Sequence, residues 1–147
     1  MRRASTTQAA HDDSPRQTLG VAAASTSELI REIERGLPLG ALESLAIGLD
    51  MGVPELAAHL GIPARTLARR KTAGRISPEE SERVVRVARL LERALSLFDW
   101  KAPEARQWLR LPKQGLAGQS PLDYARTEIG AREVENLLGR IEHGVFS

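Results

Sequence analysis

Five positively charged side chains stand close together in the middle of the chain, without a negatively charged residue among them. Between Gly61 and Ser77 the cationic residues are Arg65, Arg69, Arg70, Lys71 and Arg75. In the whole chain of 147 residues, 21 Lys and Arg nearly balance 19 Asp and Glu, so this segment is unusual within its own sequence. Guanidinium groups bind phosphate through paired hydrogen bonds. The cluster therefore indicates a nucleic-acid partner, bound in a strongly salt-dependent manner.

The elements around this cluster have the layout of a helix-turn-helix. A first helix is expected from Pro54, and its small residue Ala57 suits a close helix crossing. Gly61 can adopt the positive φ of a sharp turn, and a second helix is expected from Pro63 or Ala64. The residues offered to base edges or phosphates are Arg65, Thr66 and Arg69, and those offered to the phosphate backbone are Arg70, Lys71 and Arg75. The alternative is a helical pair with a glycine turn, which occurs in many proteins that bind no DNA.

Groups that could catalyse a reaction or bind a metal ion are few. The sequence has no cysteine and three histidines, which are far apart in the chain. His59 follows Glu55 by four residues and could share a metal with it, but a surface or packing pair explains this spacing more simply. Gly139 and Gly144 have the spacing of a phosphate-binding loop, yet Val145 stands where that loop needs lysine. We expect no metal, no cofactor and no enzymatic activity; a Ser/His/Asp arrangement is left open, although nothing specifically suggests one.

The pattern of apolar residues predicts helices throughout the rest of the chain. Leucine and alanine greatly outnumber valine and isoleucine, which favours helices over sheet. Besides the helix-turn-helix, helices are expected over residues 25–36, 39–49, 77–98, 103–111, 120–130 and 131–143. The helix from Ser77 is the best defined, because Ser77 and Glu80 have capping-box spacing and Pro78 takes the first helical position. We expect this long helix to be the hub on which the shorter helices pack.

The long helix also carries a series of arginines between its apolar positions. These are Arg83, Arg86, Arg89 and Arg93. Three glutamates of the same helix, Glu79, Glu82 and Glu92, lie near them in the sequence. We expect these charges to form a solvated helix face with ion pairs along the helix.

Residues 1–24 are predicted to form a flexible tail, because Ser, Thr, Gln, Asp and Ala dominate and no apolar periodicity is found. The tail could be a protease-accessible element or an inert extension. No stretch is long and apolar enough to span a membrane, and no apolar core follows Arg2 and Arg3 to make a secretory signal. Together with the absence of cysteine, these features fit a cytoplasmic protein without a membrane partner.

Residues 98–147 hold a second set of landmarks. In chain order these are Ala105, Trp108, Leu109, Pro112, Leu116, Gly118, Ser120, Pro121, Leu122, Gly130, Val134, Leu137, Leu138, Ile141, Gly144 and Val145. This series, preceded by a helix-turn-helix, resembles the C-terminal toxin-binding domain of the Xre/MbcA/ParS antitoxin family. Each residue also has a simpler explanation as core, loop or helix stripe, so the series describes mainly how the domain is built. One departure is the tripeptide Phe98-Asp99-Trp100, where relatives more often have a glycine-containing turn.

The resemblance implies an antitoxin of a type II toxin–antitoxin pair, whose partner is a RES-type toxin that consumes NAD. It also implies that the C-terminal segment docks into the active-site cleft of the toxin. The residues assigned to that contact are Arg140, Glu142, His143, Gly144, Val145, Phe146 and Ser147. Phe146 could fill an apolar slot while the carboxylate of Ser147 meets Arg or backbone N–H groups. On general grounds, the same ending also fits a frayed terminus.

These inferences divide the chain into a tail (1–24), a helix-turn-helix region for DNA binding and dimerisation (25–98) and a toxin-binding domain (99–147). The expected fold is all-α, with an Xre/Cro-like N-terminal region packed against a small C-terminal helical domain. The expected partners are operator DNA, the RES-type toxin and a second copy of the chain, met through the helix over 25–36. By the resemblance, the complex would repress its own operon. The alternatives are a stand-alone repressor whose C-terminal domain oligomerises or binds a ligand, and an adaptor that has lost DNA binding.

Overall fold

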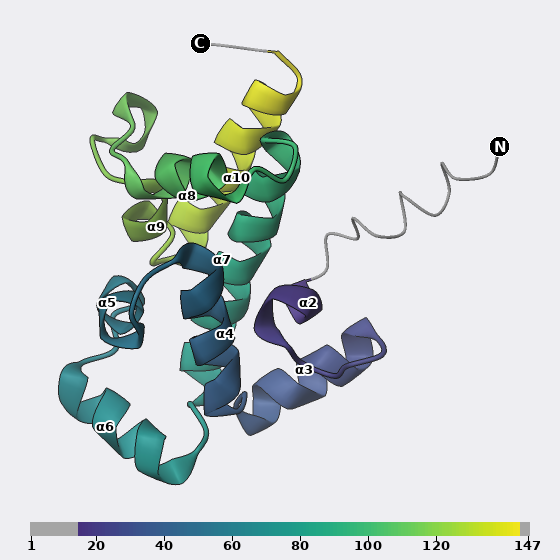
Figure 1. Ribbon diagram of the computed structural model, residues 1–147, viewed down its shortest axis with the longest axis vertical. Coiled ribbons are helices and arrows are strands. Elements are labelled where there is room, and N and C mark those ends of the chain that lie inside the picture. The colour runs from purple at the N-terminus through teal and green to yellow at the C-terminus, as the bar shows by residue number, and fades with distance from the viewer. Residues whose placement is uncertain (1–14, 145–147) are drawn as a thin grey trace, which may run out of the picture.

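The computed structural model describes residues 15–144, and every regular element in that range is a helix (Figure 1). In chain order they are α2 (Pro15–Leu19), α3 (Thr26–Arg35), α4 (Leu39–Leu49), α5 (Val53–His59), α6 (Ala64–Ala73), α7 (Pro78–Leu97), α8 (Ala102–Arg110), the 3-10 turn η1 (Gln114–Leu116), α9 (Pro121–Tyr124) and α10 (Glu128–Glu142). The all-α fold expected from the sequence is confirmed. None of the helices in this range is both long and apolar enough to cross a bilayer.

Helix α7 runs through the middle of the molecule and joins its two halves (Figure 1). It begins after Ser77, whose hydroxyl accepts the N–H of Glu80 while the Glu80 carboxylate accepts the N–H of Ser77, so the expected capping box is confirmed. Its apolar side is buried, with Val84 and Ala88 fully enclosed. Because α7 packs against α2, α3, α4, α8 and α10, its role as the hub is also confirmed.

Residues 15–24 correct the expectation of a flexible tail over this part of the chain. Helix α2 packs against α4 and α7, and the side chain of Leu19 is only 1% exposed. The hydroxyl of Thr18 donates a hydrogen bond to the carboxylate of Glu92, which is buried in α7. A single buried leucine in a polar stretch leaves no periodic pattern, so the sequence does not reveal this short helix. The expectation for residues 1–14 lies outside the described residues.

The start of the last helix also differs from the expected one. The sequence suggests a helix that ends near Gly130 and another that begins at Ala131, whereas α10 begins after the N-cap Thr127, whose hydroxyl accepts the N–H of Gly130. Gly130 therefore lies in the first turn of α10. A Cβ on Gly130 would lie 1.7 Å from the carbonyl oxygen of Tyr124, so glycine is needed here for close backbone approach rather than for ending a helix.

The link between α7 and α8 explains the departure from the family pattern at residues 98–100. Asp99 and Trp100 both have positive φ, at 54° and 63°. Glycine adopts this conformation without steric cost, and aspartate tolerates it better than most residues do. The link therefore keeps the left-handed geometry that a glycine-containing turn would have.

Trp108 on α8 is half-buried rather than a full member of the core, in contrast to Leu109, which is fully buried. The Nζ atom of Lys113 lies 4.9 Å from the centre of the Trp108 ring, a cation–π contact. Burial lowers the pKa of the Lys113 ammonium group. Trp108 therefore lies at the boundary between the core of the C-terminal domain and its surface.

Candidate functional site

Helices α5 and α6 form the helix-turn-helix, and α6 lies at the opposite end of the molecule from the end of α10 (Figure 1). The turn between them needs Gly61, whose φ is 73°. It is closed by a hydrogen bond from the N–H of Ile62 to the carbonyl of Ala57, 2.8 Å long. Ala57 is 1% exposed and Leu67 of α6 is 5% exposed, so both helices are fixed by the core beneath them.

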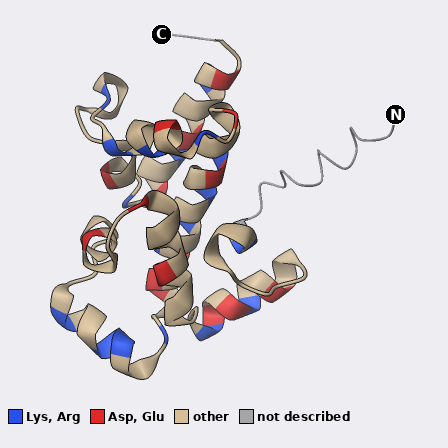
Figure 2. Cartoon of the chain, in the orientation of Figure 1, with Lys and Arg blue, Asp and Glu red and all other residues tan. Residues whose placement is uncertain are grey.

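The solvent-facing side of α6 is cationic. Arg65, Arg69 and Lys71 are exposed, and Thr66 between them is half-buried and accepts a hydrogen bond of 3.4 Å from Nη2 of Arg69. Figure 2 shows Lys and Arg along α6 with no acidic residue on the helix. Among residues 15–144, no carboxylate forms an ion pair with these three cations. Their charge is therefore available to an anionic partner.

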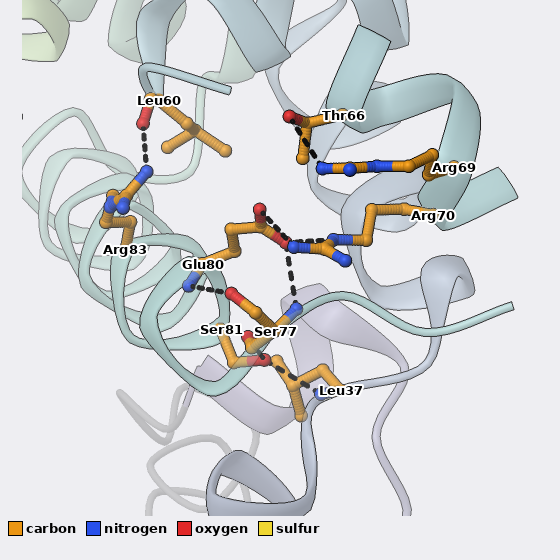
Figure 3. A network of polar contacts seen from close by, with 9 residues as sticks. All are labelled: Leu37, Leu60, Thr66, Arg69, Arg70, Ser77, Glu80, Ser81 and Arg83. Atoms are coloured by element: carbon orange, nitrogen blue, oxygen red, sulfur yellow. Dashed lines mark hydrogen bonds and ion pairs between the residues drawn. The ribbon is translucent and has the colours of Figure 1, made fainter. Parts of the chain in front are cut away.

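Arg70, on the same helix, has a different environment. Its Nε and Nη2 atoms donate to the two carboxylate oxygens of Glu80, at 2.8 and 3.1 Å, and the Glu80 side chain is only 8% exposed (Figure 3). Burial alone would raise the pKa of Glu80, but hydrogen bonds from Arg70 and Ser77, with the charge of Arg70, hold it below its usual value. This bidentate pair fastens α6 to the start of α7. The guanidinium of Arg70 is thus engaged within the protein.

Arg75 is engaged as well, in the segment that returns from α6 to α7. Its Nη1 atom donates to the carbonyl of Gly36 at 2.6 Å, and the backbones of residues 37–39 and 74–76 are joined by two further hydrogen bonds. Gly36 has a φ of 89°, and a Cβ there would lie 2.2 Å from the carbonyl oxygen of Ile76. Of the six residues that the sequence assigns to DNA, the cations Arg65, Arg69 and Lys71 are exposed without a carboxylate partner among the described residues. Arg70 is held in an ion pair, and Arg75 is exposed but donates to the backbone beside α6.

The arginines of α7 correct the expectation of ion pairs along that helix. Arg86 pairs with Glu128 at 3.3 Å and Arg93 with Glu142 at 3.5 Å, both on α10. Arg83 donates to the carbonyl of Leu60 at the end of α5. Helical spacing identifies neighbours on one helix but not the elements that pack on it, so these cross-element contacts have no signal in the sequence.

The histidine that could have shared a metal ion with Glu55 has another partner. His59 Nδ1 lies 2.7 Å from Oδ1 of Asp123, and Glu55 accepts a hydrogen bond from Arg110 at 3.2 Å. Each residue of the pair is thus bound to the C-terminal domain. In the described part of the chain, no three His, Cys, Asp or Glu side chains are grouped as a metal site would require.

The residues assigned to the toxin lie at the far end of α10. Arg140, Glu142, His143 and Gly144 are all exposed, in the last turn of α10 and just beyond it. A shallow hollow borders this end of the helix and is lined by Arg93, Glu135, Asn136, Gly139, Arg140 and His143. Val145, Phe146 and Ser147, the remaining three residues of this set, lie outside the described residues.

Two protein-family models together match nearly all of the described chain. Residues 28–89 match the family model of the antitoxin Xre-like helix-turn-helix domain. Residues 93–144 match the model of the antitoxin Xre/MbcA/ParS C-terminal toxin-binding domain. The boundary between the two matches falls in the second half of α7.

Individual relatives agree with the two domain matches. A protein named antitoxin Xre from Yersinia enterocolitica is 38% identical over 130 residues, which cover 88% of each chain. A second protein named antitoxin Xre, from Photorhabdus laumondii, is 33% identical over 132 residues, which cover 89% of each chain. A third antitoxin Xre, from Pseudomonas putida, is 33% identical over 84 residues, covering 56% of this chain and 52% of the relative.

Proposed function

The chain belongs to the Xre/MbcA/ParS antitoxin family, and on that premise we propose that it inhibits a RES-type, NAD-degrading toxin and represses its own operon. At the coarser level it is an antitoxin of a toxin–antitoxin system with a DNA-binding helix-turn-helix. The chain itself is assigned no catalytic role, in keeping with a regulator that acts by binding.

The observation that carries the DNA-binding part is the exposed cationic side of α6. Arg65, Arg69 and Lys71 would contact phosphates or base edges, with Thr66 beside them. Arg70 and Arg75 would act indirectly, because their guanidinium groups position α6. This arrangement supports docking of α6 in the major groove, as in other helix-turn-helix proteins.

A dimer is part of the proposal, because a two-fold operator is matched by a two-fold protein. Helix α3 is the candidate contact. Its residue Ile30 is 50% exposed, although it is a large apolar side chain on an otherwise highly charged helix. A second copy of α3 would cover it in an isologous contact.

The toxin-binding part is assigned to the end of α10 and the three residues that follow. The exposed groups there, Arg140, Glu142 and His143, would frame the contact. Phe146 would fill an apolar slot of the toxin, and the terminal carboxylate of Ser147 would take the place of a phosphate of NAD. The toxin would then be inhibited by occupation of its active-site cleft.

The test is to co-express the chain with the product of the neighbouring gene and to measure growth and cellular NAD. The full chain is expected to preserve both, whereas a chain lacking residues 145–147 is expected to leave NAD depleted. An Arg132→Ala variant, altered at an exposed site near the start of α10, serves as the control and is expected to protect. Full protection by the truncated chain would contradict the assignment of the C-terminal segment to toxin binding. If the product of the neighbouring gene does not lower cellular NAD when expressed alone, the proposed RES-type partner is contradicted.

A further inference from the structure

The C-terminal end of α5 is held by arginines from outside the helix-turn-helix. Arg126, which follows α9, donates from Nε to the carbonyl of His59 at 3.2 Å and from Nη2 to the carbonyl of Ala58 at 3.3 Å. Arg83 of α7 donates to the carbonyl of Leu60 at 2.9 Å. The last carbonyls of a helix lack partners within the helix and form the negative end of its dipole. Arg126 and Arg83 therefore bind the carbonyls of His59 and Leu60 and bring positive charge to this helix end, while the carbonyl of Ala58 also accepts the N–H of Gly61.

A second contact joins the same two segments. His59 Nδ1 lies 2.7 Å from Oδ1 of Asp123, at the start of the short segment that contains Arg126. The carbonyl of Arg126 in turn accepts a hydrogen bond of 3.4 Å from Arg86 of α7. The segment 123–126 of the toxin-binding domain is thus bound to α5 on one side and to α7 on the other.

These contacts converge on the turn that sets the angle between α5 and α6. At Gly61 a Cβ would lie 3.9 Å from Cδ of Arg126 and 3.9 Å from Nη1 of Arg83, so the two arginines flank the turn. In Figure 1, α5 lies between α9 and α6. The contacts from Arg126 and Asp123 therefore lie on the side of α5 that faces the C-terminal domain, whereas Arg65, Arg69 and Lys71 lie on α6.

We propose that Arg126, a residue of the toxin-binding domain, is a positioning residue for DNA binding, because it fixes the end of α5 and with it the orientation of α6. The inference rests on the proposed DNA-binding role of α6 and extends it to a residue that does not touch DNA. A helix-turn-helix reads the groove only when its second helix is presented at the right angle, so loosening the turn weakens binding without removing a phosphate contact.

The test uses the full chain and a duplex of the DNA directly upstream of its gene, with dissociation constants measured over a range of salt concentrations. Arg126→Ala is expected to weaken binding about five- to tenfold. The slope of log K against log salt should stay unchanged, because no phosphate contact is lost. Arg126→Lys, which keeps the charge and can still donate to a helix carbonyl, should recover part of the affinity. Faster exchange of the amides of Gly61 and Ile62 in Arg126→Ala would report the loosened turn directly.

Two further variants make the outcome decisive. Arg132→Ala removes the same charge from the same domain, where Arg132 pairs with Glu128, and should leave affinity unchanged. His59→Ala breaks the contact that the same segment makes through Asp123 and should weaken binding in the same way, which keeps the test available if Arg126→Ala does not fold.

Unchanged affinity in Arg126→Ala would overturn the inference, and so would a salt slope reduced by about one, which would make Arg126 a direct phosphate contact. Arg69→Ala, measured in the same series, separates this inference from its premise. If Arg69→Ala leaves binding intact, the DNA-binding role of α6 fails. If Arg69→Ala weakens binding and Arg126→Ala does not, only the positioning role fails.

Discussion

The exposed side of α6 and the end of α10 lie at opposite ends of the molecule and differ in how their charges are arranged. On α6 the cations Arg65, Arg69 and Lys71 have no carboxylate partner among the described residues. At the end of α10, Arg93 is paired with Glu142, and Glu135 borders the same hollow. A uniform cationic face suits a partner whose charge repeats, such as DNA, whereas a mixed face suits a protein partner recognised by shape and by individual contacts.

The two regions also differ in how they are anchored. Helix α6 is held by side chains, through the Arg70–Glu80 pair and the bond from Arg75 to Gly36. Helix α10 also has side-chain contacts, the Arg86–Glu128 and Arg93–Glu142 pairs, but its start depends in addition on close backbone packing, because Gly130 lies against the carbonyl of Tyr124. Substitutions of each kind of anchor should therefore separate the two functions, and the predictions below are ordered by the size of the expected effect.

The largest effect is expected from Gly130→Ala, in the toxin-binding region. The new Cβ would lie 1.7 Å from the carbonyl oxygen of Tyr124, so the start of α10 must shift, at a cost of about 3 kcal/mol or more. Urea unfolding measures the loss, and co-expression with the toxin should show failed neutralisation. Gly139→Ala is the matched control on the same helix. Its Cβ meets only Arg93 Nη2, at 3.9 Å, and we expect a gain of up to about 1 kcal/mol. Equal stability of both variants would contradict the packing argument.

On the DNA-binding side, Glu80→Gln should cost about 2 kcal/mol, because it breaks a largely buried bidentate ion pair while keeping the shape of the side chain. The loss should depend on pH. Because the folded-state pKa of Glu80 is held below 4.5, its ionised form stabilises the fold above that pH, and this contribution disappears as the pH falls through the lowered pKa.

The measurement is urea unfolding of both proteins from about pH 7 downward, and the gap between them should narrow as the pH falls below 4.5, the ordinary pKa of the carboxyl group. Glu79→Gln, altered at the neighbouring exposed carboxylate, is the control and should differ little from the unsubstituted chain at any pH. A constant gap between Glu80→Gln and the unsubstituted chain would show that the ionised pair does not stabilise the fold.

The sequence predicts the helices and the cationic cluster well, because both depend on local patterns. Capping at Ser77 and the apolar periodicity of α7 can be recognised from residues that are close together in the sequence, and the capping box is confirmed. The roles of individual arginines depend on residues outside their own helix. Nothing near Arg70 indicates that Glu80 is buried beside it, and the sequence gives Arg126 no link to His59, 67 residues away. Local patterns therefore predict where the charges are but not which of them are free.

The same reasoning explains the two expectations about elements that the structure corrects. Helix α2 is short and buries one leucine, too little for a periodic signal. Gly130 looks like a helix stop because glycine commonly ends helices, whereas its real role is a backbone contact with Tyr124. Both corrections arise from tertiary packing, which a residue pattern does not record.

A smaller effect is expected when single cations are removed, one from α6 and one from the end of α10. Arg69→Ala should weaken binding of the upstream duplex about tenfold and reduce the salt slope by about one, because one phosphate or base contact is lost. Arg140→Ala should leave DNA binding unchanged and weaken toxin inhibition instead. Gel shifts over several salt concentrations, together with NAD measurements on co-expressing cells, test both variants. Loss of DNA binding in Arg140→Ala would contradict the separation of the two surfaces.

The smallest effect is expected at the link between the two regions. Asp99 has a φ of 54°, so Asp99→Gly should relieve steric strain and stabilise the chain by about 0.5 kcal/mol, the gain being reduced by the greater entropy of glycine in the unfolded chain. Ser96→Gly, placed in the last turn of α7, introduces the same residue into helical backbone and should instead destabilise by about 0.5 kcal/mol. Thermal unfolding of the two variants measures the difference in sign. If both lose stability, the left-handed geometry of the link is not strained. If Asp99→Gly gains stability while DNA binding and toxin inhibition stay unchanged, neither surface depends on strain in this link.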